Sequence, residues 1–190
     1  KRQNCDCLGI SGGWTPAIHL FTQSGGKLKF KDKDQVFIPN TYPSDQISIG
    51  SCNGEFTLDE ILSSISKKLK DFLNIKKTEY ENLEIQSHFN KTKRNIWLLP
   101  SDKIIGKTKP FVDYQNDATA KDIKLALREG FRSIEHVKRY TTTGMGTDQG
   151  KLGNMHALGI ISETADSRMG ELGTTTFRPP YTPLTFGTIV

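Results

Sequence analysis

The chain has 190 residues, enough for one full domain or two small ones with a hydrophobic core. Only 35% of them are hydrophobic, mean hydropathy is −0.49, and no apolar run approaches the roughly 20 residues of a membrane helix. The opening Lys1-Arg2-Gln3-Asn4 lacks the apolar core of a signal peptide, and the three cysteines are too few and odd in number for a disulfide framework. These features exclude a membrane-spanning or disulfide-scaffold class and favour a cytoplasmic protein.

The net charge of +5 and the pI near 9.1 leave two interpretations open. A basic chain can bind nucleic acid or an acidic partner. Much of the excess lies between Lys67 and Lys109, where no known nucleic-acid motif accompanies it. We therefore interpret this excess as a solvated face, without binding to nucleic acid.

The first 54 residues have the pattern of the end of an α/β unit. Cys5–Ile10 is short and largely apolar, which predicts a buried strand, and a turn and a short helix at 17–23 follow. Cys5 and Cys7 have the spacing of half a metal site, but no second pair completes four ligands. Three further strands are expected at 27–31, 36–38 and 46–49.

A glycine turn, Gly50-Ser-Cys-Asn-Gly54, leads from the last of these strands into a helix. Thr57 and Glu60 have the spacing of a capping box at its start. The apolar residues recur at helical period along one face: Ile61, Leu62, Ile65, Leu69 and Leu73. The order of strand, turn and helix N-terminus suits the phosphate or ribose of a cofactor.

Residues 74–110 are rich in Lys, Asn and Thr, which indicates an extended connector. Its strong apolar cluster is Ile96–Leu99, so we expect the connector to dock through Trp97. Mobility is expected for Lys76–Lys93.

Three short helices should follow, at about 120–129, 133–140 and 150–163. Thr119 is the expected N-cap of the first, and Gly130 ends it. Residues expected to face inward are Ile123, Ala126, Leu127, Ile134, Val137, Leu152, Met155, Leu158 and Ile161.

The stretch Lys138–Lys151 interrupts this apolar periodicity with hydroxyls, basic residues and glycines. Gly144, Gly146 and Gly150 allow positive φ, so that successive N–H groups could converge on an anion or on a partner's backbone. Arg139 and Lys151 would frame this nest with positive charge. A plain interhelical turn that needs glycine for steric reasons is the alternative.

Residue chemistry alone predicts no self-contained active site. His136 and His156 flank the loop, but no carboxylate or cysteine spacing supports a metal or proton carrier there. Hydrolase, zinc and Gly-Lys-Ser/Thr phosphate-loop motifs do not appear. The last segment, Gly173–Phe186, carries three prolines and should be an extended strap laid against a larger body.

Several of these stretches, taken together, resemble the α subunits of heterotetrameric sarcosine oxidases. The matching stretches occur in the same order and are Ser11–Ser24, Cys52–Leu58, Ala120–Asn154 and Gly173–Pro183. The resemblance implies an α+β chain that is an internal or truncated portion of a longer subunit. Residues 1–54 would be the C-terminal end of its dinucleotide-binding domain, 55–165 a helical ferredoxin-like middle domain, and 166–190 the start of an aminomethyltransferase-like folate-binding domain.

The resemblance also implies a function. In that family, FAD on the β subunit oxidises sarcosine, FMN at the α/β boundary accepts electrons, tetrahydrofolate receives the one-carbon product, and the α subunit holds NAD. The expected NAD-lining residues here are Gly50, Ser51, Phe56 and Leu58. The expected residues on the FMN side are Arg139, Thr143, Gly144, Gly146 and Lys151. The expected partners are the β, γ and δ subunits.

Related amine dehydrogenases carry an iron–sulfur cluster on a similar helical module. Where that pattern has cysteines, this chain has residues such as Asp113, Gln115, Asp148 and Gly153. None can supply a thiolate, so we predict no cluster. The alternative from another class is a stand-alone basic module that binds an acidic protein or nucleic acid; an iron–sulfur electron carrier is a third hypothesis.

Overall fold

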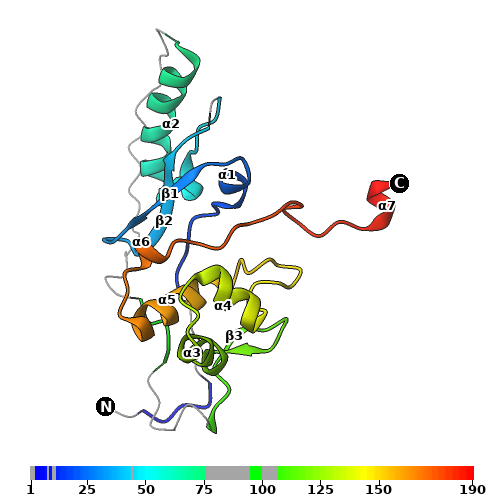
Figure 1. Ribbon diagram of the computed structural model, residues 1–190. Coiled ribbons are helices and arrows are strands. Elements are labelled where there is room, and N and C mark those ends of the chain that lie inside the picture. The colour runs from blue at the N-terminus through cyan, green and yellow to red at the C-terminus, as the bar shows by residue number, and fades with distance from the viewer. Residues whose placement is uncertain (1–2, 8, 10–11, 44, 76–94, 100–106) are drawn as a thin grey trace.

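A computed structural model describes residues 3–7, 9, 12–43, 45–75, 95–99 and 107–190. Figure 1 shows a body of helices α3, α4 and α5, a β1–β2 hairpin beside it, helix α2 extending from the hairpin, and a C-terminal strap that leaves the body. The expected mobility of Lys76–Lys93 concerns residues outside the described ranges. The expected mixture of helix and strand is confirmed.

The N-terminal hairpin agrees with its sequence pattern. α1 (His19–Gln23) has Ser24 as its C-cap, and β1 (Lys27–Lys31) pairs antiparallel with β2 (Val36–Thr41). Their two phenylalanines, Phe30 and Phe37, pack with ring centroids 4.9 Å apart. The hairpin thereby turns an apolar face toward the helical body, where Phe37 joins the core.

Two strand predictions are wrong. The described residues of 5–10 and residues 46–49 form no strand, and Cys5 and Cys7 are exposed rather than buried. An isolated apolar run becomes a strand only when another strand pairs with it. In the part of the chain that the structure describes, both sheets are two-stranded and antiparallel, β1 with β2 and β3 with β4, and neither run pairs with them.

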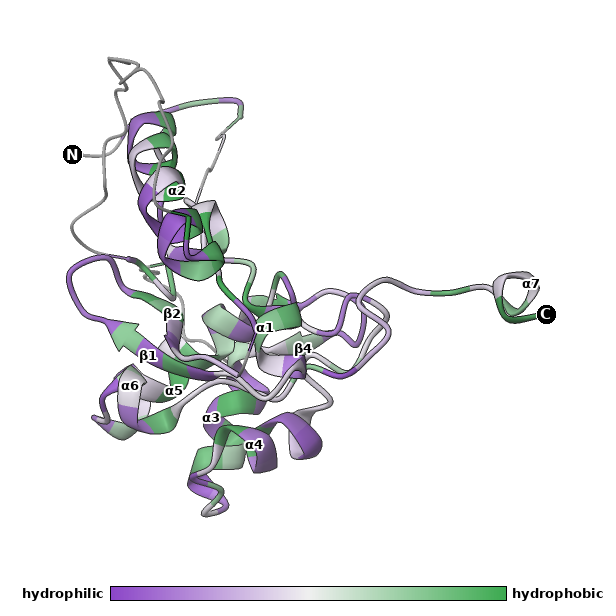
Figure 2. Cartoon of the chain, turned by 90° about the horizontal axis from the view of Figure 1, so that it is seen from above, coloured by the Kyte–Doolittle hydropathy of each residue, from purple (hydrophilic) through white to green (hydrophobic). Residues whose placement is uncertain are grey.

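The predicted glycine turn is the short 3₁₀ helix η1 (Gly50–Asn53), followed by α2 (Leu58–Leu73). The capping box is confirmed, because Thr57 Oγ1 accepts from the Glu60 N–H and the Glu60 carboxylate accepts from the Thr57 N–H. None of the α2 side chains is buried. Purple and green residues are interleaved along α2 in Figure 2. The apolar residues Ile61, Leu62, Ile65 and Leu69 are only half-buried.

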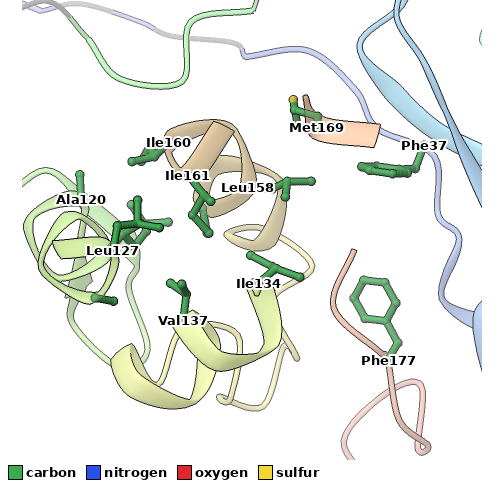
Figure 3. Close-up of a cluster of buried hydrophobic side chains, with 14 of the residues drawn as sticks. Phe37, Ala120, Leu127, Ile134, Val137, Leu158, Ile160, Ile161, Met169 and Phe177 are labelled. Atoms are coloured by element: carbon green, nitrogen blue, oxygen red, sulfur yellow. The ribbon is translucent and has the colours of Figure 1, made fainter. Parts of the chain in front are cut away.

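The core lies between α3 (Ala120–Arg128), α4 (Ile134–Thr141) and α5 (Asn154–Ala165), and a small hairpin of β3 (Phe111–Asp113) and β4 (Ala118–Thr119) precedes them. Thr119 caps α3 as predicted. Figure 3 shows the apolar side chains of the three helices converging, among them Val137, Leu158 and Ile161. Trp97 packs against this cluster, which confirms its predicted docking.

The third helix begins later than its periodicity predicted. Gly150 has φ +72°, which interrupts a right-handed helix, so residues 150–153 form turns and α5 starts at Asn154. Leu152 therefore points to solvent, with 65% of its surface exposed, and its predicted inward orientation is wrong.

The chain ends with α6 (Met169–Leu172), an extended strap, and α7 (Phe186–Ile189). The strap is non-helical as its prolines require, and both Figure 1 and Figure 2 show α7 standing away from the body. Within the described ranges, no helix combines the length and apolarity needed to cross a bilayer.

Candidate functional site

The predicted loop 139–151 begins within α4, because Arg139, Tyr140 and Thr141 form its last turn. The segment as a whole, which we continue to call loop 139–151, is held in place by Asp113. Its carboxylate accepts from the Gly144 N–H at 2.6 Å and from the Gln115 and Asn116 N–H groups at 2.8 and 3.0 Å. Burial raises the pKa of Asp113, but these hydrogen bonds outweigh it and hold the pKa below its ordinary value. The predicted nest around Gly144 is therefore filled by a carboxylate of the same chain.

Gln115 fastens the tip of the same loop. Its Oε1 accepts from the Asp148 N–H at 3.1 Å, and its Nε2 donates to Thr147 Oγ1 at 2.9 Å. A Cβ on Gly146 would lie 2.2 Å from Gln115 Oε1. Gly146 does not adopt the predicted positive φ, unlike Gly144 and Gly150; glycine is needed here because Gln115 approaches so closely.

The far end of the loop holds the strap. Gln149 donates from Nε2 to the Pro180 carbonyl at 2.6 Å, and Lys151 Nζ donates to the Tyr181 carbonyl while lying 4.0 Å from the centroid of its ring. Asn154 adds a bond from Nδ2 to Thr175 Oγ1 at 2.8 Å. The loop and the strap thus form one continuous surface.

A pocket opens between the turn before α1, the start of α5 and the strap. Its free volume is about 30 Å³ and its lining includes His19, Lys151, Asn154, Leu158 and Phe177. A space of that size holds two or three water molecules. Drug-sized ligands and cofactors occupy roughly 300–1,000 Å³, so this pocket alone does not enclose a flavin.

His19 is the unusual group in this pocket. Its ring lies 3.9 Å from that of Phe177, centroid to centroid, with 8% of its surface exposed, and neither ring nitrogen has a hydrogen-bond partner. Burial, aided by the positive charge of Lys151, lowers the pKa of His19 from 6.5 to about 4. The imidazole is therefore neutral near pH 7. His19 was not among the predicted site residues, because only folding brings the strap and Lys151 to it.

The remaining predicted loop residues differ in exposure. Arg139 is exposed and lies 3.5 Å from the Glu135 carboxylate, whereas Thr143 is buried and bonded to Thr141 through their hydroxyls at 2.7 Å. Arg139 therefore presents its charge at the surface, whereas Lys151 is half-buried. Thr143 instead supports the backbone.

The residues predicted to line NAD lie in a separate region, at the start of α2 (Figure 1). Ser51 and Leu58 are exposed, Phe56 is half-buried, and the Gly50 N–H donates to Glu55 Oε2 at 3.0 Å. Glu55 also accepts from Lys68 at 2.7 Å and from Ser64 at 2.7 Å. Glu55 was not predicted to close this turn, and no spacing in the sequence marks it for that role.

The positions expected to replace cluster cysteines do come together. Gln115 bonds to the Asp148 N–H, Asp113 lies two residues before Gln115, and a Cβ on Gly153 would lie 2.6 Å from the Val112 carbonyl oxygen. Among the described residues, no group of three or more His, Cys, Asp or Glu side chains is placed to hold a metal ion. An iron–sulfur cluster is held by cysteine thiolates, whereas these positions offer only oxygen atoms that already take part in hydrogen bonds.

Comparisons with known proteins point to one family. Residues 107–190 match the family model described as the sarcosine oxidase A3 domain. The α subunit of the sarcosine oxidase of Rhizobium meliloti (strain 1021) is 35% identical over 195 residues, covering 97% of this chain and 19% of that protein. Its counterpart from Corynebacterium sp. (strain P-1) is 32% identical over 196 residues, covering 100% and 20%. The chain thus spans about one fifth of the length of these relatives.

Two further matches are more distant. An opine oxidase subunit of Rhizobium meliloti (strain 1021) is 34% identical over 73 residues, 38% of this chain and 16% of that protein. The crystal structure of L-proline dehydrogenase from P. horikoshii superposes with a TM-score of 0.62 at 20% identity, covering 94% of this chain and 38% of that one. The structural match establishes a shared fold.

Proposed function

Because this chain belongs to the family of sarcosine oxidase α subunits, as the counterpart of about one fifth of their length, we propose that it works within such a subunit. The complex would oxidatively demethylate sarcosine to glycine, form hydrogen peroxide and pass a one-carbon unit to tetrahydrofolate. The β, γ and δ subunits would be the partners, and the cytoplasm the location. The observation that carries this proposal is the relationship to α subunits along the whole chain.

Under this proposal, loop 139–151 forms part of the FMN surroundings at the boundary with the β subunit. The N–H groups of Gly144 and Gly150 do not fit a phosphate role, because Asp113 and Asp148 already accept from them. Arg139 and Lys151 fit better, since both are cationic: Arg139 is exposed, and Lys151 is half-buried beside Tyr181. FMN supplies the electron-accepting chemistry, and the chain supplies positive charge on a loop of fixed shape.

The start of α2 is the proposed place for NAD. The Glu55 carboxylate already accepts the hydrogen bond of the Gly50 N–H, and Asp59 and Glu60 add negative charge in the first turn of α2. This charge disfavours a pyrophosphate, whereas carboxylates accept hydrogen bonds from ribose hydroxyls. We therefore expect Gly50, Ser51, Phe56 and Leu58 to line the nucleoside part of NAD.

The test removes single charges from the loop in the assembled complex. Arg139→Gln and Lys151→Gln should each weaken FMN binding at least about tenfold, as expected for loss of a charge-assisted hydrogen bond of roughly 1.5–3 kcal/mol. Flavin content is read from absorbance after gel filtration. Lys121→Gln, on the exposed side of α3, is the matched control. Unchanged flavin content in both loop variants would refute the placement of FMN.

Gly146→Val tests the shape of the loop instead of its charge. The side chain would meet the Gln115 side chain, so either Gln115 must release its bonds to the loop tip or the tip must move. We expect lower flavin content or poorer assembly with the β subunit. Normal assembly and normal flavin content in this variant would show that the loop tip lies outside the boundary.

A further inference from the structure

The first half of the strap, residues 174–181, lies across α1, α4 and the start of α5. Its inward side chains are Thr175 and Phe177, with 3% and 7% of their surfaces exposed, whereas every residue from Arg178 onward is exposed. Residues 174–178 belong to no helix or strand. This stretch is therefore held by side chains of the body, without a backbone ladder.

His19 is the residue that this half of the strap covers least favourably. Its ring lies 3.9 Å from that of Phe177 and 5.7 Å from that of Tyr181, centroid to centroid. Both ring nitrogens are buried without a hydrogen-bond partner. A buried polar group nearly always has one, because an unpaired group forfeits its hydrogen bonds to water. Lifting the strap off the ring would return both nitrogens to water.

The strap in its observed position also opposes a positive charge on His19. The groups that face the ring are Lys151 and Tyr181, and among the described residues none that lines the pocket is Asp or Glu. Burial, and secondarily Lys151, lowers the pKa of His19 to about 4, whereas the pKa of a hydrated imidazole is near 6.5. Lifting the strap therefore becomes easier as the pH falls from 6.5 toward 4.

The other charged or titratable groups nearby do not face the imidazole. Glu135 of α4 faces the strap itself, because its carboxylate accepts from the Thr176 N–H at 2.7 Å. Arg178 is exposed. The rings of His136 and His156 contact aromatic residues elsewhere on the body.

The bonds that hold this stretch can break without disturbing the core. The body side chains that make them are all half-buried, within reach of water, and are Glu135, Gln149, Lys151 and Asn154. The strap starts at Gly173, whose φ of +70° and ψ of −172° favour glycine. A pivot at this residue would move the strap and leave α6 in place.

We propose that residues 174–181 form a latch, which swings away from the body about Gly173 and exposes His19 to water, and that protonation of His19 holds the latch open. Opening also separates Lys151 from the carbonyl and ring of Tyr181. The latch would thereby free a cation of loop 139–151, a consequence that matters for FMN only if the proposed function is correct.

The test is amide hydrogen exchange of the full chain, followed by NMR at about pH 7.5 and about pH 5 and expressed as protection factors. The Thr176 and Arg178 N–H groups are bonded to Glu135 and Gln149 in the closed latch, so their exchange reports opening. Their protection should fall about 30-fold, or to the unprotected limit, because the His19 pKa is about 4 when closed and near 6.5 when open.

The Ile161 amide in α5 is the reference for unfolding of the whole body. Ile161 is fully buried, so its amide should exchange only when the helices come apart. At both pH values the protection of the strap amides should lie at least about tenfold below that of Ile161. This difference separates opening of the latch from global unfolding.

Substitutions assign the pH effect to one side chain. His19→Phe keeps a ring against Phe177 but neither titrates nor leaves a nitrogen unpaired, so the fall in protection should disappear. If the larger ring disturbs the body, His19→Leu should give the same result. Glu135→Gln keeps an oxygen that can accept from Thr176 and should retain the fall. His136→Gln, exposed on α4, is the matched control and should behave as the parent does.

Three results would overturn the proposal. Strap amides as well protected as Ile161 would mean that the strap leaves only when the body unfolds. Protection that is the same at both pH values, or already absent at pH 7.5, would show that no latch closes over His19. A fall that persists in both His19 variants would assign it to another group. Because the experiment needs no flavin, its failure would leave the proposed FMN role untouched.

Discussion

The turn at Gly50–Gly54 and the loop at 139–151 use the same local chemistry in two different settings. In both, a glycine N–H donates to a carboxylate of the same chain, Glu55 in the turn and Asp113 in the loop. The loop rests on the filled core of α3, α4 and α5, whereas α2, next to the turn, buries none of its side chains. Local hydrogen bonding therefore shapes both, but tertiary packing stabilises only the loop region strongly.

The largest expected loss of stability comes from removing a core side chain of α5, and the matching change in α2 should cost far less. Ile161 is fully buried in α5, so Ile161→Ala should lower the free energy of unfolding by about 4 kcal/mol. Ile65 on α2 is half-buried, so Ile65→Ala should cost below about 1 kcal/mol. Urea unfolding measures both. Equal losses would show that the α2 face is packed as tightly as the core.

Removing the loop's carboxylate should have the next largest effect. Asp113→Ala leaves the buried Gly144 N–H and two further N–H groups without their acceptor, which should cost about 3 kcal/mol. Asp71→Ala, on the exposed side of α2, is the control and should change stability little. A loss no greater than the control's would mean that the loop holds its shape without Asp113.

The pH dependence of stability tests His19. Burial, and secondarily Lys151, lowers its pKa to about 4 in the folded chain, whereas the unfolded value is near 6.5. As the pH falls, His19 takes up its proton in the unfolded chain before it does so in the folded chain. The free energy of unfolding is therefore highest above pH 6.5 and decreases by up to about 3 kcal/mol as the pH drops toward 4. His19→Gln should flatten this part of the profile. An unchanged slope would assign the dependence to other groups.

The smallest effect is expected at the turn. Burial raises the pKa of Glu55, but hydrogen bonds from Lys68, Ser64, Gly50 and Asn53 lower it more, so the pKa lies below 4.5. The ionised Glu55 carboxylate therefore stabilises the folded chain above pH 4.5, and this contribution is lost as the pH falls through the lowered pKa of Glu55. Glu55→Gln should cost about 1 kcal/mol at pH 7 and almost nothing at low pH. A loss that is the same at both pH values would contradict this origin.

Features encoded within a few residues could be predicted from the sequence. The capping box of Thr57 and Glu60, the N-cap Thr119 and the β1–β2 hairpin all appear where the pattern places them. Each depends on residues at most a few positions apart. The start of helix α5 is an exception. The apolar periodicity of the sequence extends back to Leu152, but the positive φ of Gly150 delays the helix until Asn154.

Features that depend on distant residues could not be predicted. The apolar run at 5–10 looks like a buried strand, but strand formation depends on a partner that the run itself does not specify. The pocket around His19 needs Lys151 and Phe177, which are distant in the sequence. Gly146 was predicted to serve a backbone conformation, whereas the approach of Gln115 is what requires it.

The packing of Trp97 on α5 provides an intrinsic optical reporter. A Cβ on Gly159 would lie 2.1 Å from the indole, so the absence of a side chain there lets the ring lie directly against the helix. The chain's other tryptophan, Trp14, has 77% of its surface exposed. The two indoles should therefore emit at different wavelengths, and the bluer component would follow melting of the helical body without any attached dye.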